Sequence, residues 1–158
     1  MPPEPLIDLS VVDTSNILAD REAIGRINPH RFEFAQLDAV CLDDEQTGMI
    51  VGYRDVRADE FWVRGHIPSR PLFPGVLMIE TAAQLVSYYV VSRGKTGKGF
   101  LGFSGVEDVK FRGTVVPGDR IIMVGKVRAI GSRRCVGATQ AFVDGQMKYQ
   151  GTIIGMWI

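Results

Sequence analysis

One long apolar segment dominates the pattern of hydrophobic and polar positions along this chain. Residues 76–91 are apolar at nearly every position, follow the dipeptide Pro74-Gly75, and end close to a stop signal at Gly94. Because apolar residues fall on nearly every face, the segment predicts a buried helix. It is shorter than the roughly twenty apolar residues of a membrane span and it carries Glu80 and Gln84. We therefore expect the central helix of a globular domain and no membrane span.

Shorter segments rich in apolar and β-branched residues surround this helix and predict strands. The loop at residues 44–48 is consistent with an antiparallel pair, Pro117-Gly118-Asp119 predicts a turn between segments, and Asp144-Gly145 is a strong hairpin signal. A short helix is expected at residues 20–27. The six expected strands cover residues 36–43, 49–56, 100–111, 120–130, 133–143 and 146–158. The chain is thus predicted to be a single α+β domain over residues 1–158, with residues 1–19 as an N-terminal extension.

Composition and charge narrow the function classes. The 158 residues include 18 lysines and arginines and 18 aspartates and glutamates, which are interspersed and leave no basic stripe for nucleic acid. Cys41 and Cys135 lie in apolar segments and are predicted to be buried free thiols of a reducing compartment. Two cysteines and two histidines at these spacings predict no metal site. The proline-rich start at residues 1–5 lacks the features of a signal peptide, so we expect a cytoplasmic protein.

Candidate chemistry is concentrated around the start of the long helix. His66 lies on a loop stiffened by Pro68, Pro71 and Pro74, and Glu80 is the one charged side chain of the helix. A buried, unpaired carboxylate usually becomes neutral or finds a partner, and Gln84 lies one turn further on. Free N–H groups at the helix start favour developing negative charge. Together these features indicate proton abstraction next to a carbonyl, with loss of a β-leaving group.

Several motifs in this order resemble the 3-hydroxyacyl-[acyl-carrier-protein] dehydratases of the FabZ type. The resemblance runs from about Asp20 to Asp144. The segment 59–66 leads without gaps into the histidine, and Glu80 occupies the position at which the related dehydratase-isomerases carry aspartate. The motifs that carry the resemblance are Asn28-Pro29-His30-Arg31-Phe32-Glu33-Phe34, Asp59-Glu60-Phe61-Trp62-Val63-Arg64-Gly65-His66, Pro74-Gly75-Val76-Leu77 with Glu80 and Gln84, Gly105-Val106-Glu107-Asp108-Val109-Lys110-Phe111-Arg112 and Val116-Pro117-Gly118-Asp119.

The resemblance implies a hot-dog fold, in which a curved antiparallel sheet wraps a long helix, and a homodimer, with trimers of dimers also possible. It implies that His66 removes the C2 proton and that Glu80, from the other subunit, protonates the departing 3-hydroxyl. The substrate would be an acyl thioester on the phosphopantetheine of acyl carrier protein, so that no cofactor is needed. The residues that would bind substrate are Pro74, Gly75, Val76, Ile67 and Gln84.

The chain departs from the family pattern after the histidine. The usual His-Phe-Pro-Gly is replaced by His66-Ile67-Pro68-Ser69. Ile67 removes an aromatic ring beside the base, and Ser69 adds a Cβ where glycine would allow positive φ. Neither change removes a proton-transfer group, so both bear on substrate range rather than on the reaction.

Other interpretations remain open at this point. The same fold serves acyl thioesterases, and a non-catalytic acyl-binding subunit could keep the fold. His30 is interpreted as a structural or interface residue. Two basic clusters are candidates for docking the acidic carrier protein, and simple solvated surface explains each of them equally well. These clusters are Arg93 with Lys95 and Lys98, and Arg133 with Arg134.

Overall fold

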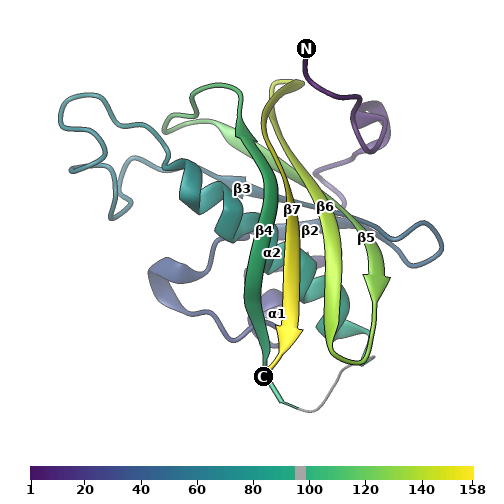
Figure 1. The fold of residues 1–158 in the computed structure, drawn as a ribbon. Coiled ribbons are helices and arrows are strands. Elements are labelled where there is room, and N and C mark those ends of the chain that lie inside the picture. The colour runs from purple at the N-terminus through teal and green to yellow at the C-terminus, as the bar shows by residue number, and fades with distance from the viewer. Residues whose placement is uncertain (95–98) are drawn as a thin grey trace.

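The computed structural model describes residues 1–94 and 99–158, which form one curved antiparallel sheet around a long helix (Figure 1). The long helix α2 covers Gly75–Ser92, and the short helix α1 covers Arg21–Gly25. Two single-turn 3-10 helices lie at Leu9–Val11 and Phe32–Phe34. The strands are β1 (Ala19–Asp20), β2 (Ala39–Asp44), β3 (Met49–Asp55), β4 (Leu101–Phe111), β5 (Arg120–Ile130), β6 (Arg134–Val143) and β7 (Gln146–Trp157).

Four of the six strand pairs in the described sheet join sequence neighbours, and β3–β5 and β4–β7 do not. Its described strands follow the order β1-β2-β3-β5-β6-β7-β4, and every neighbouring pair is antiparallel. The long connection through α2 carries β4 to the far edge, beside β7. Strand β4 is therefore an edge strand, and its register with β7 shifts twice along its length.

The predicted α+β hot-dog architecture is confirmed, with six of the seven strands close to their expected limits. Strand β2 begins at Ala39 rather than at residue 36, because the Gln36 amide donates to a side chain of α2 instead of to a neighbouring strand. The two-residue β1 is too short to leave an alternating pattern in the sequence. Gly94 adopts a φ of 61° just after α2, as expected of a helix stop.

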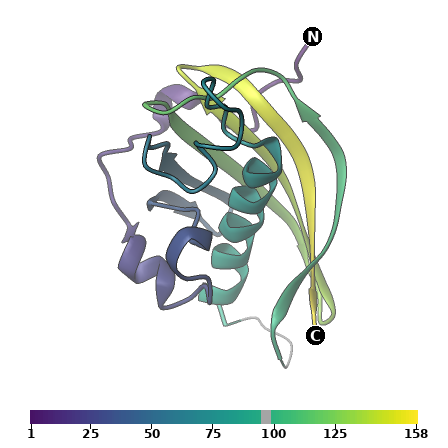
Figure 2. The ribbon, with the colours of Figure 1, turned by 90° about the vertical axis from the view of Figure 1, so that its left-hand side faces the viewer.

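Helix α2 lies in the concave face of the sheet (Figure 2). Leu85, Val86 and Val90 of the helix are buried, and they belong to the same core as Ile50 of β3 and Met123 of β5. Each buried aliphatic side chain of this kind contributes about 1.5–3 kcal/mol relative to exposure. With a mean hydropathy of 1.2 the helix matches a membrane span by length and composition, but half of it is buried inside the protein. The central helix of a globular core can have the same length and hydropathy, and α2 is such a helix.

The N-terminal extension covers the opposite face of the sheet. A second apolar cluster, which includes Cys41 and Val124, is packed against Leu6 and Leu9. The Leu6 N–H also donates to the side chain of Gln140 on β6, at 2.8 Å. Both cysteines of the chain are buried free thiols, as predicted.

Candidate active site

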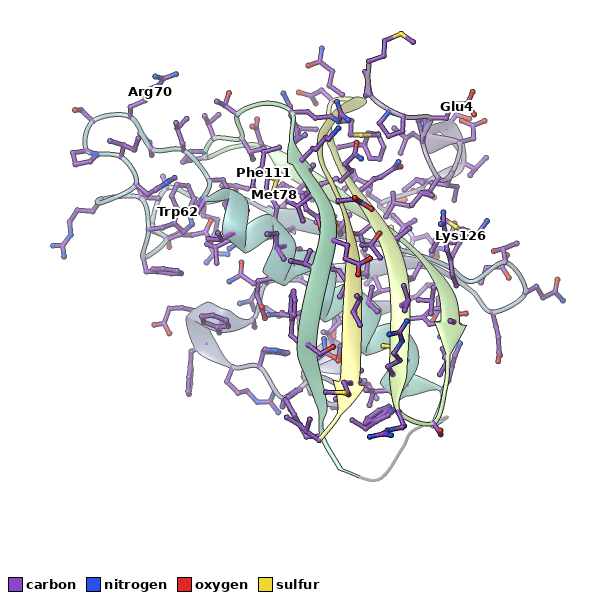
Figure 3. The ribbon with its side chains drawn as sticks, viewed as in Figure 1. Glu4, Trp62, Arg70, Met78, Phe111 and Lys126 are labelled. Carbon is purple, nitrogen blue, oxygen red and sulfur yellow. The ribbon has the colours of Figure 1, made fainter. Side chains whose placement is uncertain are left out.

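The loop that connects β3 to α2 projects from the body of the protein, and Arg70 lies at its outer end (Figure 3). Its base is fixed by packing: the buried Trp62 meets Phe73 edge to face, with ring centroids 5.5 Å apart. Arg54 of β3 also lies over the Phe73 ring, at 4.7 Å. Ser69 adopts a φ of 61°, so the serine occupies the left-handed region that glycine would favour.

His66 is held at both its backbone and its ring. Its N–H donates to Trp62 O at 2.8 Å, and its carbonyl accepts from the Leu72 N–H at 2.9 Å. Nδ1 of the ring lies 2.7 Å from the Leu72 carbonyl oxygen. Because a carbonyl only accepts, Nδ1 carries the proton, and in the neutral ring Nε2 keeps its lone pair. The exposed His66 is thus oriented as a base that acts through Nε2.

The start of α2 presents two backbone amides. Gly75 and Val76 lie at the first positions of the helix, and the first bond of the turn is donated by Leu77 to Pro74 O. The N–H groups of Gly75 and Val76 therefore have no carbonyl one turn earlier. A Cβ at Gly75 would lie 2.9 Å from the ring of Phe111, so this position accommodates little more than glycine. Of the other predicted substrate contacts, Pro74 is buried and Ile67 is 48% exposed on the loop.

Glu80 lies on the second turn of α2 and is not the isolated, fully buried carboxylate that the apolar pattern indicated. Its side chain is 21% exposed, and its Oε1 accepts a hydrogen bond of 2.8 Å from Gln84. Gln84 itself is fixed, because Nε2 also donates to Phe34 O and Oε1 accepts from the Gln36 N–H. The expected contact between Glu80 and Gln84 is confirmed, and the polar atoms of Gln84 are occupied within the chain.

His30 is the partner of Glu80 that the sequence analysis missed. Its Nε2 lies 3.4 Å from Oε1 of Glu80. Burial lowers the pKa of His30 below 6.5 and Arg31 lowers it further, although the charge of Glu80 opposes both effects. Its buried Nδ1 has no hydrogen-bond partner in the described part of the chain. The two residues are 50 positions apart, and nothing in their local sequences marks the contact.

A single chain does not bring the two predicted catalytic residues together. His66 bonds to Leu72 on the projecting loop, whereas Glu80 faces His30 and Gln84 on the helix. Within residues 1–94 and 99–158 no hydrogen bond or ion pair joins His66 to Glu80.

A cavity of about 220 Å³ lies beside Glu80, between α2 and the far strands of the sheet. Ala83 and Ser87 line its helix side, and Cys135 and Ile153 line its sheet side. Both of these sheet residues are buried, whereas Phe100 and Phe103 at the start of β4 are about half exposed. The cavity therefore runs from an open end near β4 to a closed apolar interior.

Comparison with known proteins places this chain in a family. Residues 28–154 match the model of the FabA-like domain. Over 135 residues the chain is 33% identical to 3-hydroxyacyl-[acyl-carrier-protein] dehydratase FabZ of Clostridium botulinum strain Okra, which covers 85% of this chain and 93% of that protein. FabZ of strain Kyoto is also 33% identical over the same length, with the same coverage.

Solved structures agree on the fold. The dehydratase heterocomplex ApeI:P from Xenorhabdus doucetiae superposes with a TM-score of 0.72 at 14% identity, covering 85% of this chain and 90% of that one. The E. coli PaaI protein from the phenylacetic acid degradation operon gives a TM-score of 0.58 at 18% identity, with 74% and 80% coverage. At these identities the structures support the fold alone, whereas the sequence relatives identify the type of dehydratase within the family. The chain belongs to the FabA-like family, as a dehydratase of the FabZ type.

Proposed function

We propose that this protein dehydrates 3-hydroxyacyl thioesters carried on acyl carrier protein to the trans-2-enoyl thioesters, in the biosynthesis of fatty acids or related lipids. The observation that carries the proposal is the orientation of His66. Its Nδ1 is bonded to the Leu72 carbonyl, which leaves Nε2 free to accept a proton. A chain that kept the fold as a non-catalytic acyl-binding subunit would not need a base oriented in this way.

In the proposed reaction, His66 Nε2 takes a proton from C2 of the substrate. The C2–H electron pair forms the C2–C3 double bond, and the C3–O bond breaks. Glu80 gives its proton to the departing hydroxyl, which leaves as water. His66 then loses its new proton to solvent and Glu80 takes one from solvent, which restores the starting state. Every atom and electron is accounted for without a cofactor, so we propose that none takes part.

The amides of Gly75 and Val76 are proposed to bind the thioester carbonyl. Proton removal from C2 places negative charge on that oxygen, and two unbonded N–H groups at a helix N-terminus stabilise such charge. The small Gly75, pressed against Phe111, allows the oxygen to come close to the backbone. Pro74 and Ile67 would line the approach, with Gln84 holding Glu80 in place.

We propose that the complete site forms between two copies of the chain. His66 and Glu80 are not in contact within one chain, so a second copy is needed to bring a His66 to each Glu80. Edge strand β4 supports this pairing, because it exposes Phe103, Val106 and Phe111 along a row of unpaired backbone groups. The family resemblance also allows such dimers to assemble as trimers of dimers.

The acyl tail is proposed to enter the cavity beside Glu80. Its lining is mostly apolar and its volume is about 220 Å³. An apolar tail would bury its methylene groups against this lining, so the cavity is proposed to limit the chain length that the enzyme accepts.

The carrier protein is proposed to dock at the outer part of the His66 loop. Arg70 is exposed there (Figure 3), and Arg64 is an exposed residue of the same loop. Neither forms an ion pair within the described residues. Of the clusters named from the sequence, Arg93 pairs with Asp43 and stacks on Tyr89, so it is not a free cation. Lys95 and Lys98 lie outside the described residues. Arg133 is exposed in the β5–β6 turn and Arg134 is exposed at the start of β6, away from the loop (Figure 1).

The described residues include no group of three or more histidine, cysteine, aspartate and glutamate side chains that could hold a metal ion. The buried free thiols of Cys41 and Cys135 fit the cytoplasmic location that we propose, where cysteines stay reduced.

The deciding experiment mixes purified protein with 3-hydroxyacyl and trans-2-enoyl thioesters on carrier protein and follows both the enoyl-thioester absorbance and free thiol. Reversible interconversion without thiol release supports the dehydratase. Release of free thiol would instead identify a thioesterase, and no change with any chain length would favour a non-catalytic subunit.

A further inference from the structure

A row of buried polar side chains crosses the core between the His66 loop and the Glu80 helix. Gln36, Arg54 and Gln84 are exposed by only 0%, 5% and 2%, although each carries several hydrogen-bonding groups. They come from three different elements: the segment before β2, strand β3 and helix α2. Polar groups buried this deeply are costly unless they are fully paired, so their partners show what they hold.

The row begins at the loop. Both terminal nitrogens of Arg54 bond to the carboxylate of Glu60, which lies at the start of the loop, and the Nη1–Oε2 distance is 3.1 Å. The same carboxylate accepts the Arg57 N–H at 2.8 Å. The guanidinium also covers the ring of Phe73, at the other end of the loop. Arg54 therefore contacts both ends of the segment that carries His66.

The row continues to the helix. Nε of Arg54 donates to Oε1 of Gln36 at 2.9 Å, and the backbone N–H of Gln36 donates to Oε1 of Gln84 at 2.8 Å. Gln84 then donates to Oε1 of Glu80 at 2.8 Å. The remaining donors of Gln36 and Gln84 are bonded to the carbonyls of Glu33 and Phe34. Hydrogen bonds through Arg54, Gln36 and Gln84 thus connect the His66 loop to the carboxylate of Glu80.

Stability alone does not account for this arrangement. Apolar side chains of similar volume usually stabilise a core at least as well as a buried ion pair does, because both charges lose their hydration. What the paired side chains add is directional restraint, since each bond is short and each member is already committed to fixed partners. Restraint of this kind matters most where reacting groups must be placed accurately.

We propose that Arg54 and Gln36 are positioning residues, which hold the His66 loop and the Glu80 carboxylate in one rigid frame. This inference rests on the proposed dehydration, in which His66 and Glu80 transfer the protons. Arg54 acts through Glu60 and Phe73 on the loop, and Gln36 connects it to Gln84 and so to Glu80. In a dimer with shared sites, the frame of one chain fixes the histidine of one site and the glutamate of the other.

The test replaces the charged pair as a unit. Removing Arg54 alone would leave Glu60 buried without its partner and risks unfolding, so the variant is Arg54→Met with Glu60→Gln. We expect kcat for 3-hydroxyacyl thioesters to fall between about tenfold and about a hundredfold, with KM changed by less than about threefold. The matched control is Arg93→Met with Asp43→Asn, which removes a half-buried ion pair at the far end of α2 and should change kcat by less than about twofold.

A folded Arg54→Met/Glu60→Gln dimer with kcat within about twofold of the parent would overturn the positioning role. If that variant does not fold, Gln36→Met is the second test, because methionine has a similar volume. It removes the side-chain bonds of Gln36 to Arg54 and to the Glu33 carbonyl, and it keeps the backbone N–H that bonds to Gln84. It should also lower kcat by about tenfold, and unchanged kcat would refute the frame. Failure of the proposed function is separately visible, since the parent protein would then form no enoyl thioester.

Discussion

Substitution of Ala83 by leucine should shorten the acyl chains that the enzyme accepts. Ala83 lies on α2, one turn after Glu80, and its side chain lines the cavity of about 220 Å³. Leucine adds three carbon atoms that point into this space. These three atoms take the place of about three methylene groups of the tail, so the longest tail that fits should be about three carbons shorter than in the parent.

The loss follows from the burial of methylene groups. Each buried methylene contributes about 0.8 kcal/mol, so three that no longer fit cost about 2.4 kcal/mol of binding. At about 1.4 kcal/mol for each factor of ten, kcat/KM should fall about 50-fold for substrates whose tails fill the parent cavity. Substrates at least three carbons shorter should keep their kcat/KM.

The assay measures kcat/KM for a series of 3-hydroxyacyl thioesters that differ only in chain length, with the parent and Ala83→Leu. Ala83→Ser, which adds one atom at the same position, is the control and should lower kcat/KM only about fourfold, and only for tails that fill the parent cavity. If Ala83→Leu lowered kcat/KM equally at every chain length, or left long chains unaffected, the tail would not occupy this cavity.

Three further predictions concern the catalytic groups, the docking surface and the loop. His66→Ala and Glu80→Gln should each lower kcat by about 10² or more while the chain stays folded, and near-normal dehydration by both would contradict the assignment. Arg64→Glu with Arg70→Glu should raise KM for carrier-bound substrate by about tenfold or more but should not raise KM for the pantetheine thioester. The control Arg133→Glu with Arg134→Glu should change neither of these KM values. Equal effects of both pairs would refute the docking surface. Burial raises the pKa of Glu60, but hydrogen bonds from Arg54 and the Arg57 amide outweigh it and hold this pKa below 4.5. The stabilisation that the carboxylate provides is therefore complete above about pH 4.5 and is lost as the pH falls through the lowered pKa. Denaturant unfolding should show that the parent's free energy of unfolding exceeds that of Glu60→Gln by less in acid than above pH 4.5. A difference that stays constant across this range would contradict the argument.

The fold was largely predictable because its signals are local. Strands β3 to β7 and helix α2 begin and end within about two residues of the expected positions, since apolar runs and turn residues mark them directly. The two-residue β1 and the covering of the outer sheet face by the N-terminal extension were not predictable. Both depend on contacts with distant strands, such as that between Leu6 and Gln140.

The candidate site was predictable only in part. His66, Glu80 and the helix N-terminus stand close together in the sequence, and the Glu80–Gln84 contact follows from their spacing of one helical turn. The contacts of His30 with Glu80 and of Gln36 with Gln84 join residues 50 and 48 positions apart, so no local pattern indicates them. The partners of Glu80 also correct the expectation that its carboxylate is isolated in an apolar helix. Likewise, the pairing of Arg93 with Asp43 could not be inferred from a basic cluster.

The central claim is that His66 of one chain and Glu80 of its partner form each site, and mixed dimers test it most directly. Chains carrying His66→Ala and chains carrying Glu80→Gln are co-expressed with different tags, and activity is compared with that of each variant alone. In a random mixture half of the dimers are mixed, and each has one intact site of two, so about a quarter of parental activity should return. If the two residues instead acted within one chain, mixing would restore no activity, and the shared site would be wrong.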